Sequence, residues 1–261
     1  MCGRYASTRA PADLIDEFGI DRDQISQTLD PDYNVAPTDQ VYAVVERPPS
    51  RGQGEDASAD AEPERQLRTL RWGLVPFWAK NPGIGNKMIN ARMETVAEKP
   101  AFKQAFAKRR CLLPADGYYE WYETGQQTKA GKPVKQPYFI RSKDGTPLAM
   151  AGLYEIWRDP ARGDDDPRRF LWSATVLTTT AEDAVGQVHD RMPLLVDPAR
   201  WADWLDPRPH DKDTLLGLLV PAVPGLLDAY PVSTAVNNVR NNGPELIEPL
   251  PLDHVDLAKR S

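Results

Sequence analysis

The sequence contains few of the residues that form disulfides or bind metals. Its 261 residues include only two cysteines, Cys2 and Cys111, and three histidines. Two cysteines cannot build a disulfide framework, and no histidine stands beside a cysteine or carboxylate at the spacing typical of metal ligands. We therefore expect two free thiols, no structural metal and no cofactor.

Long apolar runs are also absent. No stretch of about 18 apolar residues is present, so no membrane span is predicted. The first residues lack the basic segment and apolar run of a secretory signal, which favours the cytoplasm. A composition of 41% hydrophobic and 27% charged residues is that of a globular protein, and 261 residues can bury a sizeable core. We expect a monomer.

The charge is unevenly distributed. The whole chain carries −6, yet residues 65–110 hold eleven lysines and arginines against two glutamates, a local charge of +9 that leaves −15 elsewhere. Such asymmetry is typical of a surface that binds phosphates. Solvated charges on helices and loops explain it equally well, so charge alone does not decide between these interpretations.

The pattern of apolar residues predicts a β-rich body with a few helices. Strand-like runs, typically bounded by polar hairpin loops, occupy 41–46, 148–157 and 170–180. Helices are predicted over 11–18, over 94–107 as two short helices broken at Pro100, over 197–205, and from Thr180 to Val185. Polar segments at 47–64, 125–136 and 158–169 are predicted to be flexible insertions within one domain spanning 1–261. The predicted class is α+β, with a central, mostly antiparallel, barrel-like sheet and flanking short helices.

Cys2 carries the most informative chemistry. Because its side chain is small, removal of Met1 by methionine aminopeptidase is expected, which would leave an N-terminal 1,2-aminothiol. The α-amine titrates near about 8 and the thiol near about 8.5, so both have nucleophilic fractions at neutral pH. With an aldehyde, the amine forms an imine and the thiol closes a thiazolidine, which an internal cysteine cannot do. A cysteine that stands second by chance is the alternative.

Four further polar residues are candidates for a reactive site. His189 lies in VHDRMP, where a loop position favours proton transfer, although a packed core histidine is the common alternative. Glu120 lies between two aromatic residues that would desolvate it and raise its pKa, unless it faces water at a strand edge. Asn90 and Arg92 follow a glycine-rich turn and offer an amide and a phosphate-binding fork.

Basic and aromatic residues alternate in the segment 68–80. They include Arg71, Trp72, Trp78 and Lys80. Unpaired bases stack on aromatic rings while cations hold the backbone, so this composition suits single-stranded nucleic acid. Tryptophans at this density also build protein cores, and the segment does not separate the two roles.

The motifs together resemble one family, the SOS-response-associated peptidases (SRAP). Nine segments match in family order over nearly the whole chain: MCGRY (1–5), YNVAPT (33–38), RWGLVPFWAK (71–80), NAR (90–92), CLLPADGYYEW (111–121), AGLYEIW (151–157), TTTA (178–181), HDRMP (189–193) and VNNVRNNGPELIEP (236–249). The resemblance implies an α+β domain with a central β-barrel. It also implies covalent crosslinking to abasic sites in single-stranded DNA, through a thiazolidine at Cys2, and hence an association with the nucleoid on DNA.

The resemblance also assigns roles by position. Cys2 would be the nucleophile, surrounded by Asn90, Glu120 and His189. The phosphate-binding arginines would be Arg4, Arg92 and Arg191, and the aromatic residues of the DNA channel would be Trp72 and Trp121.

Two rival functions stay open. A thiol peptidase would use Cys2, His189 and Glu120 as a triad, and autoproteolytic removal of Met1 would need the same groups. A non-catalytic module would only bind single-stranded DNA. Within the crosslinking hypothesis, an imine intermediate would also permit a slow abasic-site lyase side activity.

Overall fold

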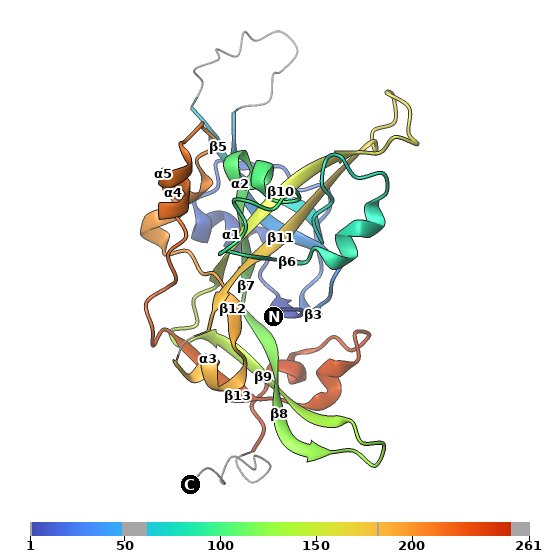
Figure 1. Cartoon of the computed structure of the whole chain (residues 1–261), viewed down its shortest axis with the longest axis vertical. Coiled ribbons are helices and arrows are strands. Elements are labelled where there is room, and N and C mark those ends of the chain that lie inside the picture. The colour runs from blue at the N-terminus through green and yellow to red at the C-terminus, as the bar shows by residue number, and fades with distance from the viewer. Residues whose placement is uncertain (1, 49–61, 182, 252–261) are drawn as a thin grey trace.

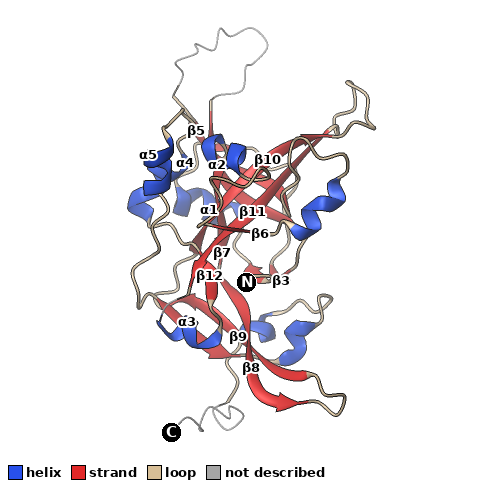
Figure 2. Cartoon of the chain, viewed as in Figure 1, coloured by secondary structure: helices blue, strands red, loops and turns tan. Residues whose placement is uncertain are grey.

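Strands make up most of the computed structural model, which describes residues 2–48, 62–181 and 183–251 (Figure 1). The helices are short and lie around the strands (Figure 2). The strands are β1 (Tyr5–Ser7), β2 (Arg22–Asp23), β3 (Asp32–Val35), β4 (Gln40–Arg47), β5 (Glu64–Trp72), β6 (Asn90–Arg92), β7 (Arg110–Ala115), β8 (Gly117–Gln127), β9 (Pro133–Ser142), β10 (Leu148–Arg158), β11 (Phe170–Thr180), β12 (Arg191–Pro193) and β13 (Leu227–Pro231). The α-helices are α1 (Pro11–Phe18), α2 (Lys103–Lys108), α3 (Asp183–Val188), α4 (Trp201–Leu205) and α5 (Lys212–Gly217), and the 3₁₀ helices are η1 (Pro82–Lys87), η2 (Pro198–Arg200), η3 (Thr234–Asn237) and η4 (Pro244–Ile247).

Five strands close into a barrel in the order β5, β4, β7, β10, β11. Four of the five contacts are antiparallel, and the parallel pairing of β11 with β5, where Ala174 lies opposite Trp72, closes the ring. The prediction of an α+β protein with a mostly antiparallel, barrel-like sheet is therefore confirmed.

The interior of the barrel is narrow and filled by side chains. Gly152 on β10 lies opposite Cys111 on β7, and both face inward. A Cβ atom at Gly152 would lie 2.9 Å from the Cys111 Sγ and 3.0 Å from the carbonyl oxygen of Thr175. Cys111 is thus a buried thiol that fills the barrel, and glycine at 152 leaves it room.

A second sheet, ordered β13-β9-β8-β1-β3, lies below the barrel in Figure 1. Strand β1 pairs with both β3 and β8, so the N-terminal segment is held inside this sheet. The described N-terminal end of the chain consequently lies between the two sheets, where Cys2 joins the barrel core.

The helix predictions are confirmed in part. Helix α1 spans 11–18 as predicted, with Pro11 in its first turn and Gly19 at φ 59° ending it. The Asp197 side chain caps the backbone N–H of Ala199 at 2.9 Å, but a 3₁₀ turn precedes α4 there. Helix α3 begins at Asp183 and ends at Val188, beyond the predicted range.

The prediction of two helices over 94–107 is wrong. Only α2 forms, while residues 94–98 make turns. Pro100 disfavours the helical conformation of Lys99, the residue before it, so a helix over 94–99 could not continue into α2.

The three predicted insertions differ in the structure. Most of 47–64 lies outside the described residues. Strands β8 and β9 run into 125–136 and leave only 128–132 as a turn, because the polar residues continue a solvent-exposed ladder. Of the segment 158–169, Arg158 ends β10 and residues 159–169 form the turns of the β10–β11 hairpin, where the Asp159 N–H donates to the Arg169 carbonyl at 2.8 Å.

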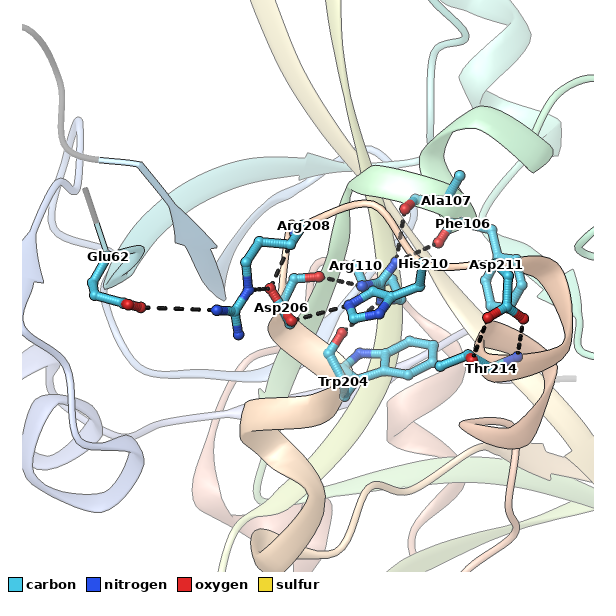
Figure 3. Close-up of polar contacts among 10 residues, drawn as sticks. All are labelled: Glu62, Phe106, Ala107, Arg110, Trp204, Asp206, Arg208, His210, Asp211 and Thr214. Atoms are coloured by element: carbon cyan, nitrogen blue, oxygen red, sulfur yellow. Dashed lines mark hydrogen bonds and ion pairs between the residues drawn. The ribbon is translucent and has the colours of Figure 1, made fainter. Parts of the chain in front are cut away.

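Arg110 links the barrel to the helices beside it (Figure 3). Its guanidinium donates to the carbonyls of Phe106 at 2.8 Å and Ala107 at 3.0 Å, which end α2, and to Trp204 at 2.7 Å in α4. It also donates to the Asp206 carbonyl. Burial lowers the pKa of Arg110 to about 10, so the group remains charged at neutral pH. One cation therefore satisfies the carbonyl ends of two helices.

Candidate functional site

Cys2 is fully buried between the two sheets. Its Sγ lies 3.8 Å from the carbonyl oxygen of Arg4. Burial, followed by the negative charge of Glu120, raises the pKa of the Cys2 thiol well above its ordinary value. At neutral pH, Cys2 is therefore a protonated thiol and not a thiolate.

Asn90 holds the backbone of Cys2. It begins β6, whose parallel pairing with β11 places Asn90 opposite Val176. The Asn90 Nδ2 donates to the Cys2 carbonyl at 2.7 Å. Its Oδ1 is buried without a hydrogen-bond partner among the described residues, so this acceptor remains available to a donor at the site.

Glu120 and His189 approach each other, and the charge of Glu120 acts on Cys2. Glu120 on β8 is 2% exposed, and burial raises the pKa of its carboxyl group. The His189 Nε2, just after α3, lies 4.0 Å from the Glu120 Oε2. Asn90, Glu120, His189 and Cys2 thus come from distant positions in the chain to one place, as the motifs predict.

The backbone N–H of Arg191 donates to the His189 Nδ1 at 3.0 Å. The Asp190 carboxylate lies 2.9 Å from the same nitrogen, but its side chain is 86% exposed and is solvated by water. We therefore take Nδ1 as the acceptor of the Arg191 amide, which places the proton of the neutral imidazole on Nε2, toward Glu120.

Arg191 already has a carboxylate partner. Its Nη1 and Nη2 lie 2.5 Å and 3.1 Å from the two oxygens of Glu94, and Nη2 also donates to the Thr178 carbonyl at 2.6 Å. The hydrogen bonds from Arg191 lower the pKa of Glu94. Arg191 is itself buried, so a phosphate would have to compete with Glu94 for this guanidinium.

The other predicted arginines differ in their surroundings. The Arg4 Nη1 donates to the Asn34 Oδ1 at 2.5 Å and to the Val236 carbonyl at 3.0 Å, which ties η3 to the N-terminal segment. The Arg71 Nη2 donates to the Asn86 Oδ1 at 2.7 Å. Arg92 is exposed at the end of β6.

The three predicted tryptophans occupy different environments. Trp72 is fully buried, its Nε1 donates to the Ile89 carbonyl at 3.0 Å, and Tyr5 packs against its ring edge-on at 5.1 Å. In this structure Trp72 therefore cannot present a ring face to a base, and it belongs to the core. Trp121 is half-buried and donates to the Asn237 Oδ1 at 2.7 Å, whereas Trp78 is 49% exposed.

Part of the +9 charge of residues 65–110 is used inside the fold. Arg65 is paired with Glu46 at 2.9 Å and Arg109 with Glu155 at 2.8 Å, and Arg110 is buried. The exposed cations of the stretch are Lys80, Lys87, Arg92, Lys99, Lys103 and Lys108. The local net charge thus overstates the surface available to a phosphate backbone.

Neither a metal-binding cluster nor a helix that could span a membrane is found in the described part of the chain. No group of three or more His, Cys, Asp or Glu side chains there is arranged to hold a metal ion. Within residues 2–48, 62–181 and 183–251, no helix has the length and apolar character needed to cross a membrane.

Residues 1–239 match the model of one protein family, described as SOS response associated peptidase (SRAP). The chain belongs to the SRAP family. Among its relatives, the abasic site processing protein YoqW of Bacillus subtilis is 38% identical over 95% of this chain and 99% of its own length. The abasic site processing protein YedK of Escherichia coli is 31% identical over 96% of this chain and 100% of its own.

Solved structures share this SRAP fold. A Bacteroides thetaiotaomicron protein superposes with a TM-score of 0.74 over 95% of this chain and 100% of its own, at 24% identity. The arrangement of barrel and second sheet is therefore a known architecture.

Sequence reasoning missed three residues of this SRAP site. Glu94 was counted only as one of two acids in a basic stretch, and no pattern pairs it with Arg191. Asn34 and Asn237 stand inside the matching segments YNVAPT and VNNVRNNG. The asparagines within those two motifs were the available signal. In the structure the Asn34 side chain accepts a hydrogen bond from Arg4, and the Asn237 side chain accepts one from Trp121.

Proposed function

We propose that this protein senses abasic sites in single-stranded DNA and traps them covalently as a thiazolidine at Cys2, once Met1 has been removed. One observation carries the proposal: Asn90 holds the Cys2 carbonyl at 2.7 Å beside a buried Glu120 and His189. Cleavage of the bond between Met1 and Cys2 would put a primary amine among these groups. That relatives of the chain are named abasic site processing proteins supports the same chemistry.

The reaction has two bond-forming steps. The α-amine attacks the aldehyde carbon of the ring-opened sugar, and loss of one water gives an imine. The Cys2 S–H then adds across the C=N bond, with sulfur joining carbon and the proton passing to nitrogen. Because a thiolate is the better nucleophile and burial raises the pKa of Cys2, the S–H proton must leave the sulfur as the new C–S bond forms.

The surrounding groups have separate roles in this mechanism. His189, whose Nε2 we take to be protonated, would assist opening of the sugar hemiacetal. Glu120 would accept a proton from the α-amine, and Asn90 would orient the aminothiol. The imine is also an electron sink, so slow β-elimination of the strand would compete with ring closure as a lyase side activity.

The DNA strand would run over the half-buried and exposed Arg4, Arg71 and Arg92 near this site, and it would reach the buried Arg191 by displacing Glu94. We place Arg92, Arg191, Arg4 and Arg71 on its phosphates, and Trp78 and Trp121 against its bases. Shielding of the lesion would follow from covalent attachment at Cys2.

A thiol peptidase would require different electrostatics. Its cysteine is activated as a thiolate, generally beside a cationic histidine. The raised pKa of Cys2 and the carboxylate next to it favour the protonated thiol instead. The same groups could still serve one autoproteolytic removal of Met1.

The proposal is tested by mixing the protein with a single-stranded oligonucleotide that bears one abasic site. We expect a product that survives heat and detergent on a denaturing gel, with the mass of the Met1-less protein plus DNA minus one water. Cys2→Ala should abolish this product and retain DNA binding. Cys111→Ala, which removes the other buried thiol, should retain the product. No adduct from a protein confirmed to lack Met1 would contradict the proposal and favour the peptidase.

Glu94→Gln is expected to strengthen binding to undamaged single-stranded DNA. It removes the carboxylate that neutralises Arg191, so about one more cation can contact a phosphate. The dependence of log Kd on log salt should steepen by about 0.7 for that contact. Titrations at several salt concentrations measure it, with Glu98→Gln as a control of equal charge change at an exposed residue. Equal slopes in the two variants would contradict a phosphate role for Arg191.

A further inference from the structure

Arginines 47 and 68 lie at the end of the barrel farther from Cys2. Arg68 and Trp72 are on β5 with Leu70 between them, and the alternation of a strand places all three on the inward face. Trp72 packs at the Cys2 end, and Arg68 lies four residues earlier, roughly 13 Å along the strand. Arg47 ends β4, on the inward face with Val45, and belongs to the same end of the barrel.

Both arginines lie over one aromatic ring. The Cζ of Arg68 is 4.4 Å and that of Arg47 is 4.9 Å from the ring centroid of Trp172 on β11. Trp172 is itself stacked on Tyr154 of β10, at 5.7 Å between centroids and 6° between planes. Contact with a ring uses the flat face of a guanidinium and leaves the N–H groups at its edge available to an anion.

Neither arginine has a carboxylate partner within the described residues. Glu64, opposite Arg47 in the strand register, is paired with Arg22 at 3.2 Å. The Arg68 Nε donates to the Gln66 Oε1 at 2.9 Å, a neutral acceptor.

The two positive charges consequently remain close together and partly shielded from water. Burial, and then the charge of Arg47, lowers the pKa of Arg68. Two guanidiniums that lie side by side on an aromatic ring repel each other. An oxyanion would offset this repulsion and accept hydrogen bonds from several of their N–H groups.

We propose that Arg47 and Arg68, supported by Trp172, form a second anion site that binds a phosphate group at this end of the barrel. The paired forks match the several oxygens of a phosphate better than a single carboxylate does. The phosphate could belong to a DNA backbone or to a small phosphorylated molecule. The site does not depend on the chemistry at Cys2.

The test follows the indole N–H resonance of Trp172 by NMR, identified by its loss in Trp172→Phe. Inorganic phosphate is added at constant ionic strength, with chloride as the reference anion. We expect a saturable shift in the wild-type protein. Arg47→Gln combined with Arg68→Gln should weaken binding by about tenfold or more. Arg141→Gln should bind normally, because Arg141 lies over the ring of Tyr230 in the other sheet, at 5.5 Å.

A second double variant guards against a folding defect. Arg47→Lys with Arg68→Lys keeps both charges but loses the planar forks, and it should bind phosphate more weakly than wild type while unfolding at a similar temperature. No saturable shift in the wild-type protein, or an undiminished shift in the glutamine double variant, would overturn the proposal.

Two further titrations identify the source of the phosphate. A short single-stranded oligonucleotide without an abasic site should shift Trp172 at lower concentration than inorganic phosphate if the ligand is a DNA backbone, and only at higher concentration if it is a small phosphate. Polyglutamate acting at lower concentration than either would overturn the proposal in favour of an acidic protein. Cys2→Ala should titrate like wild type, so this site and the crosslinking function can fail independently.

Discussion

Glutamine at position 120 is expected to slow covalent capture of abasic-site DNA by about 10²–10⁴-fold, the usual contribution of a positioned acid or base. Glu120 is buried beside the Cys2 thiol and lies 4.0 Å from the His189 Nε2, where a proton leaving the α-amine can be received. The amide of glutamine is close in shape but cannot accept that proton. Single-turnover rates on denaturing gels measure the effect, and affinity for undamaged DNA should change little.

The pH dependence of the rate gives an independent readout. Burial raises the pKa of Glu120, so the wild-type rate should fall with decreasing pH at a value above the ordinary glutamate pKa of about 4.3. Glu120→Gln should lack this inflection.

The same shift affects stability. The folded chain holds the Glu120 proton at pH values where the unfolded chain has released it, so this contribution to stability is full below about 4.3 and is lost as pH rises through the folded pKa. Glu120→Gln should remove that loss from the free energy of unfolding.

Glu155→Gln is the matched control for position 120. Glu155 is also a buried glutamate with a pKa raised by burial, but it is paired with Arg109 at 2.8 Å. Its replacement should leave the rate of capture and its pH profile unchanged. If both variants slowed capture equally, a general loss of packing would explain the effect and Glu120 would have no chemical role.

Local sequence patterns predicted the strands well. The run 170–180 became β11 with the same bounds, and 148–157 became β10 with one residue added. Alternating apolar residues between polar turns determine such strands locally. The closure of the barrel by β5 and β11 could not be predicted from pattern, because that parallel contact joins strands about a hundred residues apart.

The surroundings of individual side chains were harder to predict than which residues lie close together. The positions of Cys2, Asn90, Glu120 and His189 in the motifs indicated a common site, and the structure brings them together. The family resemblance assigned Trp72 to the DNA channel, while the composition of its segment left a core role open. Its neighbours in space are instead Tyr5 and the core of the barrel, and this burial depends on pairing between distant strands.

Arg110→Met is expected to lower the free energy of unfolding by about 3–5 kcal/mol. The arginine is 2% exposed and donates to four backbone carbonyls that end α2 and α4 or follow α4 (Figure 3). Methionine fills most of the volume but donates nothing, so these buried acceptors lose their partner. Urea unfolding followed by circular dichroism measures the change.

Arg208→Met is the comparison for Arg110. Arg208 is joined to the carboxylate of Asp206 at 2.8 Å, next to the carbonyl that Arg110 contacts, but its side chain is 64% exposed (Figure 3). Burial alone would raise the pKa of Asp206. The hydrogen bonds from Arg208 have the opposite effect and outweigh burial, so the pKa of Asp206 is lowered. Solvent screens this pair, so its loss should cost at most about 1 kcal/mol. Equal losses at the two positions would mean that the surface ion pair, and not the buried guanidinium, holds α4 to the barrel.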